Sequence, residues 1–325
     1  MAYIGVGAGF VLLLVGAEFL VRGAVALANR FGVSQLLIGL TVVAYGTTAP
    51  ELVVSLDAAL AGKPGLSVGN VVGSNIANVL LVLGSAALVC PLACRAGALR
   101  RDGPVMIAAA LVMVGLGLTG RIVAWHGAIM VAALVGLTVH AYRAERRGGA
   151  AAAMHAQEAA EFAGHPRSPA AMAASVAAGI AAVVVGAHLL VLGAVELAQA
   201  FGVSDAVIGL SLVAVGTSLP ELATAVVAAY RGHPEVALGN VLGANTFNVL
   251  AIMGIVSLVT PLPIPPEIAG FDLWVMLGVT LVFVPWMMTR RRLGRGLGAA
   301  FLVAYATYIF VLYAGLSGVA QAGAT

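Results

Sequence analysis

Two glutamates, Glu51 and Glu221, stand in the middle of long apolar segments. A charged side chain at the centre of a membrane helix costs about 2.5–3.5 kcal/mol on insertion scales, so intramembrane acids usually have a function. Thr47 and Thr217 precede them by four residues, which places hydroxyl and carboxylate on one helix face. If neighbouring groups only formed hydrogen bonds to two buried acids, the matching positions of these acids in the two halves would remain unexplained. We therefore expect both glutamates to bind a cation.

A proline precedes each glutamate, at Pro50 and Pro220. Proline donates no hydrogen bond and clashes with the carbonyl four residues back, so the carbonyls of Gly46 and Gly216 should lose their helical partners. We expect the helix to bend or unwind near residues 44–47 and 214–217. Irregular backbone at membrane depth is tolerated where it lines a cavity or is buried in protein. The two breaks would therefore add bare carbonyls to the carboxylates and hydroxyls.

The next apolar segment of each half adds amides. Ser74 and Asn78 lie four residues apart and are expected to face the same region, whereas the second half has Ala244 and Asn248 there. All these candidate ligands are hard oxygens, and Ca²⁺ takes about 6–8 oxygen ligands in flexible geometry. The sequence has no His/Cys cluster of the kind that zinc or copper prefers. The charge of one Ca²⁺ would neutralise two carboxylates.

The composition identifies the class of protein that must position these residues. Of 325 residues, 62% are apolar and 9% are charged, against about 25% charged in a typical soluble domain. This excludes a soluble enzyme, a nucleic-acid binder and a secreted disulfide scaffold, and it leaves an integral membrane protein. The two cysteines, Cys90 and Cys94, imply no disulfide framework.

The chain divides into ten apolar segments long enough to cross a bilayer, which needs about 20 residues. They are continuously apolar rather than alternating, so we predict an all-α polytopic membrane protein. The first segment lacks a basic leader and is not expected to be a cleaved signal peptide. The predicted spans are residues 3–28, 34–61, 66–92, 103–120, 122–142, 170–198, 204–230, 235–260, 270–289 and 297–317.

The basic residues predict the orientation of these spans. Thirteen of the sixteen fall on one side, two (Lys63 and Arg121) fall on the side of both termini, and Arg22 lies inside the first span. By the positive-inside rule, both termini lie outside and the Ala-rich 143–169 segment is a cytoplasmic linker. We expect the protein to lie in the cell membrane, which is the inner membrane where a cell has two.

The chain is internally repeated. Residues 31–84 align with 201–254 at a constant offset of 170, with 27 of 54 positions identical. Each half, 1–142 and 170–325, carries five predicted spans. Because five is odd, the second half enters the membrane from the opposite face, which is the inverted-repeat plan of many secondary transporters. We therefore predict two inverted five-helix repeats, with discontinuous second and seventh helices.

The paired motifs G-T-[ST]-x-P-E, from Gly46 and Gly216, and G-N-x-x-G-[SA]-N-x-x-N, from Gly69 and Gly239, resemble the α-repeats of the calcium/cation antiporter superfamily. The match is to its sodium/calcium exchanger branch, especially the small prokaryotic members. The resemblance implies that the glutamates bind Ca²⁺ and Na⁺ alternately, with the first and sixth spans sliding as a gate. It implies these ligands: Glu51, Glu221 and main chain near Thr47 and Thr217 for Ca²⁺; Thr48, Ser218, Ser74 and the Ala44 and Ala214 carbonyls for Na⁺; and Asn78 and Asn248 lining the centre.

The resemblance also implies a transporter of Ca²⁺ and monovalent cations that needs no cofactor, is not an enzyme, contacts the lipid bilayer and works as a monomer. Two residues depart from the family pattern: Ala244 replaces a common serine, and Asn248 replaces an acid found in some members. Asn248 keeps Ca²⁺/H⁺ exchange open as an alternative, and a cation channel is an alternative of a different class. The sequence contains neither the HExxH nor the GxSxG motif of hydrolytic enzymes.

Overall fold

The computed structural model describes residues 2–31, 33–93, 96–147, 168–200 and 214–322. Within these ranges, eight helices are long and apolar enough to cross a membrane, and a ninth span results if the bent pair Gly39–Thr47 and Ala49–Leu60 is counted as one. The predicted span 204–230 lies partly outside the described residues. Its described portion contains the shorter apolar helix Leu219–Tyr230.

The first half begins with one long helix, α1 (Ala2–Phe31). The second predicted span is built from four short pieces, α2 (Gln35–Ile38), the π-helix η1 (Gly39–Val43), α3 (Ala44–Thr47) and α4 (Ala49–Leu60). The third comprises α5 (Pro64–Ala77), the π-helix η2 (Asn78–Val82) and α6 (Leu83–Val89). Two long helices complete this half, α7 (Ala96–Leu118) and α8 (Ala124–Arg147).

The described elements of the second half follow the order of the first, with one additional π-helix. It begins with α10 (Pro169–Ala200), and its described continuation is α12 (Ala214–Thr217) and α13 (Leu219–Tyr230). Next come α14 (Pro234–Phe247), the π-helix η4 (Asn248–Met253) and α15 (Gly254–Val259). The π-helix η5 (Ile268–Asp272) leads into α16 (Leu273–Arg290), and α17 (Arg295–Ala322) ends the described chain.

Turns of the same geometry join the second and third spans of each half. Gly62 and Gly232 end α4 and α13 with positive φ angles of 72° and 77°, a conformation that favours glycine. Pro64 and Pro234 then occupy the first position of α5 and α14, where the missing N–H of proline costs no hydrogen bond. Local sequence therefore sets both turns, at positions 170 residues apart.

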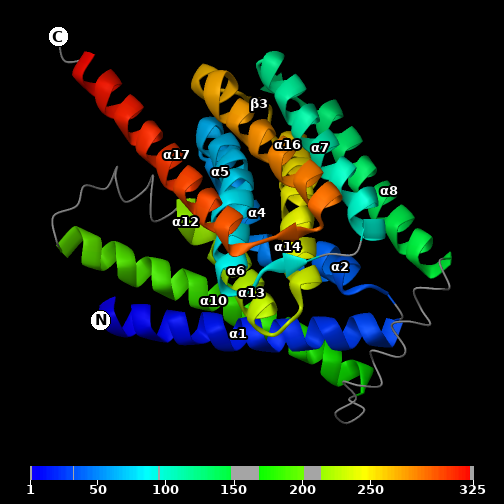
Figure 1. Cartoon of the computed structure of the whole chain (residues 1–325). Coiled ribbons are helices and arrows are strands. Elements are labelled where there is room, and N and C mark those ends of the chain that lie inside the picture. Colours follow the sequence, from blue (N-terminus) through cyan, green and yellow to red (C-terminus); the bar gives the residue numbers. More distant parts are fainter. Residues whose placement is uncertain (1, 32, 94–95, 148–167, 201–213, 323–325) are drawn as a thin grey trace.

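Helices α1 and α10 pack closely against each other along one side of the molecule. In Figure 1, α1 runs along the bottom of the view beside α10, and the other helices stand above them. A Cβ atom on Gly16 would lie 2.7 Å from the backbone nitrogen of Val183, and one on Gly186 would lie 2.7 Å from that of Leu13. Glycine is thus required at both positions for the close approach of these two helices.

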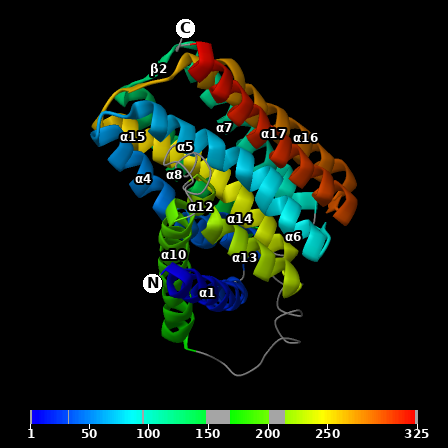
Figure 2. The same ribbon diagram turned by 90° about the vertical axis from the view of Figure 1, so that its left-hand side faces the viewer.

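Two small antiparallel ladders join the halves. Strand β1 (Leu92–Ala93) pairs with β4 (Arg292–Leu293), and β2 (Arg121–Ile122) pairs with β3 (Leu262–Pro263). The chain runs from β1 through α7 to β2, and from β3 through α16 to β4. The packed helices α7 and α16 therefore run in opposite directions between the same two ladders, and Figure 2 shows α16 and α17 on the far side of the molecule from α1.

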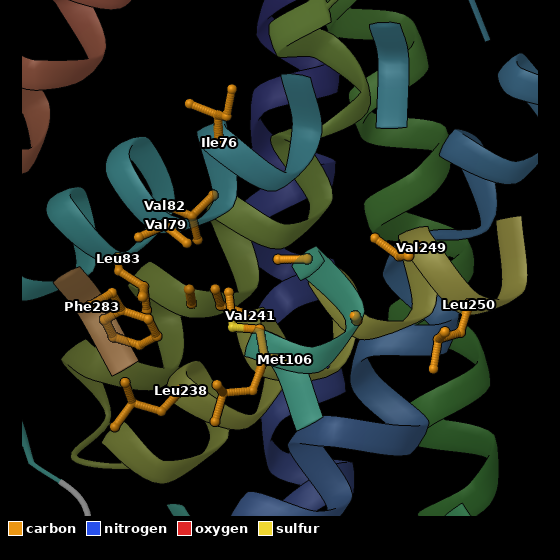
Figure 3. Close-up of a cluster of buried hydrophobic side chains, with 14 of the residues drawn as sticks. Ile76, Val79, Val82, Leu83, Met106, Leu238, Val241, Val249, Leu250 and Phe283 are labelled. Carbon is orange, nitrogen blue, oxygen red and sulfur yellow. The ribbon is translucent and has the colours of Figure 1, made fainter. Parts of the chain in front are cut away.

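The hydrophobic core lies around the third span of each half. The apolar windows of Pro64–Val89 and Pro234–Val259 are 78% and 83% buried, against 22% for the window in α8 and 17% for that in α17. Figure 3 shows buried side chains from α5, η2, α7, α14 and α16 gathered together, including Ile76, Met106, Val241 and Phe283. The central helices are therefore enclosed by protein, while the outer ones present apolar faces such as Phe310, which suits contact with lipid.

The spacing of Glu18 and Arg22 predicts an ion pair within α1, and the structure confirms it. A second arginine, Arg231 at the end of α13, also binds this carboxylate: its Nη2 lies 2.7 Å from Glu18 Oε1, and its Nε donates to Oε2 at 2.7 Å. Sequence reasoning missed this contact, because the two residues are 213 positions apart. The pair ties α1 to the loop between α13 and α14.

Replacing Arg231 with alanine is expected to lower the free energy of unfolding by only about 0–1 kcal/mol, because partly exposed ion pairs are screened by water. The Arg231 and Glu18 side chains are 44% and 22% exposed. Thermal unfolding at low and high salt checks this, and the loss should shrink at high salt. Lys63→Ala, which removes an exposed charge from the corresponding loop of the first half, is the control. A loss of unfolding free energy in Arg231→Ala that exceeds about 1 kcal/mol and does not depend on salt would contradict the prediction.

Candidate functional site

The second span breaks one residue later than predicted. Residues 44–47, where we expected the backbone to unwind, form the short helix α3, and the break falls on Thr48 with φ −83° and ψ 5°. Helix α4 then begins at Ala49, with the two parts bent by 47°. The physical reason is the place of Pro50 in the first turn of a new helix, a position where its missing N–H is not needed.

Two backbone hydrogen bonds cross this break in the described stretch, from Thr48 N to the Ala44 carbonyl (3.0 Å) and from Leu52 N to the Thr48 carbonyl (3.3 Å). The carbonyl of Gly46, opposite Pro50, receives no backbone bond there, as expected. The Ala44 carbonyl, which the family resemblance implies as a Na⁺ ligand, also accepts from the hydroxyls of Thr48 and of Thr47, the latter at 3.3 Å. It is therefore already engaged in this structure.

The second half breaks at the corresponding residue. Ser218 leaves the helical conformation with φ −86° and ψ 3°, and α13 begins directly after it with Pro220 in its first turn. Ser218 N donates to the Val215 carbonyl at 3.1 Å, and Leu222 N donates to the Ser218 carbonyl at 3.0 Å. Ala214 begins the short helix α12, and its side chain lies outside the described part of the chain. In both halves, a new helix thus begins at the proline-glutamate motif.

Glu51 and Glu221 lie in the first turns of α4 and α13, and both are completely buried. The first turn of a helix favours a negative charge, because the backbone N–H groups there carry partial positive charge. Among the described residues, no hydrogen-bond partner reaches any of the four carboxylate oxygens. Buried carboxylates without partners are costly, and these two also repel each other when both are ionised. A bound cation would relieve both costs.

Four other predicted ligands carry a buried oxygen that also lacks a partner within the described ranges. These atoms are Ser74 Oγ, Ser218 Oγ, Asn78 Oδ1 and Asn248 Oδ1. With the carboxylates they make a set of buried oxygen acceptors, the chemistry that a hard cation such as Ca²⁺ or Na⁺ requires. The hydroxyls of Thr47 and Thr48, in contrast, are already hydrogen-bonded within the protein.

The fold brings these residues together across the two halves. Helix α3 packs against α14, and α12 packs against α5. The π-helix η2, which begins with Asn78, contacts α13 with its Glu221, while η4, which begins with Asn248, contacts α4 with its Glu51. Asp57, for which a solvated or paired role is predicted, is exposed on α4. Each helix that carries an acid thus packs against the π-helix that begins with an asparagine of the opposite half.

Two further asparagines, Asn70 and Asn240, connect the halves beside the acids. Asn240 Oδ1 accepts from the Thr47 hydroxyl at 3.2 Å, and its Nδ2 donates to the Glu221 carbonyl at 3.5 Å. Asn70 makes the corresponding contacts, accepting from Thr217 at 3.4 Å and donating to the Glu51 carbonyl at 3.4 Å. We did not predict them as site residues, although both stand in the repeated Gly-Asn motif.

Asn240→Ala is expected to lower the free energy of unfolding by about 1–3 kcal/mol, because it leaves buried hydrogen-bonding groups without partners. Thermal unfolding of the purified chain checks this. Thr280→Ala is a matched control, since Thr280 is equally buried but bonds only to the Met276 carbonyl of its own helix in the described structure. Equal losses in both variants would contradict a special role for Asn240.

The fold and the buried oxygen set are those of a membrane cation transporter, and comparison with known proteins agrees. A family model for "Sodium/calcium exchanger protein" matches residues 1–143 and 172–314. The chain is 35% identical to the putative antiporter CaxA of Alkalimonas amylolytica over 96% of this chain and 99% of that one. It is 36% identical to the inner membrane protein YrbG of Escherichia coli over 94% of both chains.

A third relative is the sodium/calcium exchanger MaX1 of Methanosarcina acetivorans, with 31% identity over 94% of this chain and 96% of that one. A solved structure of the sodium-calcium exchanger NCX_Mj superposes with a TM-score of 0.82 at 30% identity, covering 96% of this chain and all of that one. The chain therefore belongs to the sodium/calcium exchanger family. It is an integral membrane protein of a family of cation antiporters.

Proposed function

We propose that this protein exchanges Ca²⁺ for Na⁺ across the membrane by alternating access, with Glu51 and Glu221 binding the two ions in turn. The observation that carries the proposal is the pair of fully buried carboxylates, whose four oxygens have no partner in the described structure. Two carboxylates supply the charge that one Ca²⁺ neutralises, and the surrounding ligands are oxygens. The family of the chain supports the choice of ions.

We assign the other ligands as follows. Main-chain carbonyls near Thr47 and Thr217 complete the Ca²⁺ shell together with the carboxylates. Asn78 and Asn248 line the centre of the site with the unpartnered oxygens of their amides. Na⁺ takes the remaining oxygens: Thr48, Ser218, Ser74 and the carbonyls of Ala44 and Ala214. Because the Ala44 carbonyl accepts hydrogen bonds from Thr47 and Thr48, we expect both hydroxyls to reorient when Na⁺ binds.

The site is proposed to hold either Ca²⁺ or the counter-ions, never both. Each loaded state neutralises Glu51 and Glu221, which allows the buried site to pass between the two faces of the membrane. With no ion bound, two carboxylates would repel each other in a region without water, so the empty protein should resist the exchange of states. This difference in charge makes the transport coupled rather than a leak, which is the behaviour that separates an antiporter from a channel.

We propose that the chain forms ten spans in two inverted repeats, 1–142 and 170–325, joined by the linker 143–169. Adding 170 to the residue numbers of β1 gives β3, and β2 corresponds to β4 at an offset of 171, so the ladders β1–β4 and β2–β3 exchange between the halves. The helix breaks at Thr48 and Ser218 and the π-helices beginning at Asn78 and Asn248 correspond in the same way. The basic-residue bias supports termini outside and a cytoplasmic linker.

A second candidate is Ca²⁺/H⁺ exchange through the same glutamates. The specific observation in its favour is the neutral, buried pair Ala244 and Asn248, which add neither a hydroxyl nor a charge to the site. Two protons would neutralise Glu51 and Glu221 as completely as two Na⁺ ions. The oxygen set facing Ca²⁺ is the same in both cases, so the two candidates differ only in the counter-ion.

The test is uptake of ⁴⁵Ca²⁺ into proteoliposomes, with Na⁺ and pH gradients imposed separately at clamped membrane potential. Uptake that requires internal Na⁺ is the expected result, and uptake that follows only the pH gradient would establish the alternative. Uptake that needs neither counter-ion would indicate a channel and overturn both. Protein-free liposomes with the same gradients control for leakage.

A further inference from the structure

Four buried asparagines link the two halves at the centre of the molecule: Asn75, Asn78, Asn245 and Asn248, which we call the amide clasp. Asn78 Nδ2 donates to Asn245 Oδ1 at 3.0 Å, and Asn248 Nδ2 donates to Asn75 Oδ1 at 3.0 Å. All four side chains are at most 3% exposed. Each half thus supplies one donor and one acceptor to the other half, at positions 170 residues apart.

The remaining amide groups of the clasp tie the same helices through their backbones. Asn245 Nδ2 donates to the Asn75 carbonyl at 3.0 Å, and Asn75 Nδ2 donates to the Asn245 carbonyl at 3.5 Å. Every amide nitrogen of the clasp therefore has an acceptor. Of its four amide oxygens, those of Asn78 and Asn248 have no partner in the described structure.

This pattern fixes which end of the Asn78 and Asn248 amides is left without a partner, namely the oxygen. An asparagine side chain has an oxygen that accepts and a nitrogen that donates, and the two ends are almost equal in shape. If Asn248 turned over, its oxygen would face Asn75 Oδ1, and two acceptors would meet without a proton between them. Leaving such buried groups unpaired costs about 1–3 kcal/mol. Asn78 is held in the same manner by Asn245.

The orientation matters because a cation is attracted by the amide oxygen and repelled by the amide NH₂. Asn78 and Asn248 begin the π-helices η2 and η4, which pack against α13 and α4, the helices of Glu221 and Glu51. Single π-helical turns are frequent at functional sites. The partners Asn75 and Asn245 each sit three residues earlier, in the last turn of α5 and α14.

We propose that Asn75 and Asn245 are positioning residues for the ion site, which hold Asn78 and Asn248 of the opposite half so that only their oxygens are available to a cation. Because of the clasp, the centre of the site presents hydrogen-bond acceptors but no donors. It therefore binds cations and excludes anions. It also couples the two halves: the ligand orientation in one depends on the asparagine of the other. This inference rests on the proposed function of the same site.

The test is a pair of double-mutant cycles on ⁴⁵Ca²⁺ binding to the purified full-length chain in detergent. Asn75→Ala and Asn248→Ala should each weaken Ca²⁺ binding about tenfold, and the double variant should also be about tenfold weaker, because both changes remove one interaction. The cycle of Asn245→Ala with Asn78→Ala should behave alike. The crossed pair of Asn75→Ala with Asn78→Ala should lose about 100-fold, because those two residues belong to different hydrogen bonds.

A merely structural role would lower the thermal stability without this pattern of pairs. Thr246→Ala is the control, since Thr246 is buried in α14 but bonds within its own helix to the Leu242 carbonyl. Single Asn75 and Asn245 variants that bind Ca²⁺ within twofold of the natural chain would overturn the inference, as would equal losses in all double variants. A natural chain that binds no Ca²⁺ would overturn the proposed function, and this inference with it.

Asn245→Asp provides a second variant if an alanine chain does not fold. The aspartate keeps an oxygen that accepts from Asn78 Nδ2, so Asn78 stays oriented. Its second oxygen takes the place of Asn245 Nδ2, which donates to the Asn75 carbonyl at 3.0 Å, and it donates there only when it is protonated. We expect the protonated variant to bind Ca²⁺ within about threefold of the natural chain, because the Asn78 oxygen stays available. A tenfold loss of Ca²⁺ affinity in a folded Asn245→Asp protein would contradict the positioning role.

Discussion

Glu51→Gln is expected to abolish Ca²⁺ uptake, with a loss of at least about 100-fold, since removing one of two carboxylates from a buried divalent site costs well over 2.7 kcal/mol of binding. Glutamine keeps the size of the side chain and one oxygen but not the charge. The residue is completely buried, so water cannot replace the lost ligand. Initial rates of ⁴⁵Ca²⁺ uptake in proteoliposomes, normalised to reconstituted protein, check the prediction.

The same variant is expected to be more stable than the natural chain when no ion is bound. Burying a charge without a partner is costly, and the carboxylates of Glu51 and Glu221 repel each other. The neutral amide removes both costs, so the unfolding temperature without Ca²⁺ should rise. Added Ca²⁺ should then change it little, whereas the natural chain should gain about 2.7 kcal/mol at 100 times its dissociation constant.

Glu221→Gln should behave like Glu51→Gln, because both acids start a helix and both lack partners in the described structure. Asp57→Asn is the matched control: it removes an acid from the same helix α4, but an exposed one. Normal uptake and a Ca²⁺-dependent unfolding temperature are expected for Asp57→Asn. Uptake by Glu51→Gln at the natural rate would refute the assignment of the carboxylates as ion ligands.

Much of the site could be predicted because its signals are local. The cost of charge at membrane depth singles out Glu51 and Glu221 without knowledge of the fold, and the preceding prolines predict a broken helix. The position of the break was wrong by one residue. Proline was expected to unwind the turn before it, but Pro50 suits the first turn of a following helix, so the break falls on Thr48.

Contacts between the halves could not be predicted from helical periodicity. Spacing along the chain shows which side chains share a helix face, and for that reason it identified Glu18 with Arg22. It does not show which faces meet. Arg231 reaches Glu18 from 213 residues away, and Asn240 reaches Thr47 from 193 residues away. Both contacts depend on how the helices dock.

The state of the Ala44 carbonyl could not be predicted either. Pro50 frees the carbonyl of Gly46, whereas the Ala44 carbonyl keeps its backbone donor, Thr48 N, at 3.0 Å. Serine and threonine hydroxyls commonly bond to a carbonyl three or four residues earlier. Thr47 and Thr48 both do so here. A carbonyl beside the break is therefore available to a cation only where no local hydroxyl competes for it.

Gly243→Ala is expected to disrupt the protein more than any other single methyl group added to these central helices. A Cβ atom at Gly243 would overlap the carbonyl oxygen of Leu40 and lie 2.7 Å from the Cβ of Ala44. The overlapped atom is backbone, so no side chain can rotate away. Overpacking of this kind costs about 1–3 kcal/mol and occasionally more. A lower unfolding temperature and a smaller yield of monodisperse protein should result.

The position of Gly243 adds a functional consequence to the structural one. It lies where α14 packs against η1 and α3, and relief of the clash requires α3, which carries Ala44 and Thr47, to move away from α14. The Thr47 hydroxyl would then lose its 3.2 Å contact with Asn240. We therefore expect Ca²⁺ binding to weaken at least about tenfold in whatever Gly243→Ala protein folds, because about 1.4 kcal/mol of lost interaction is sufficient.

Gly278→Ala distinguishes this effect from the general consequences of replacing a helical glycine. Gly278 lies inside α16, and a Cβ atom there would meet nothing within 4 Å. Alanine at an open helical position should raise the free energy of unfolding by up to about 1 kcal/mol. If Gly243→Ala matched Gly278→Ala in stability and Ca²⁺ affinity, close packing of α14 on α3 would not be needed to form the site. A loss of stability in Gly243→Ala together with a gain in Gly278→Ala would establish that the distance between the backbones of α14 and α3 sets the positions of the ligands.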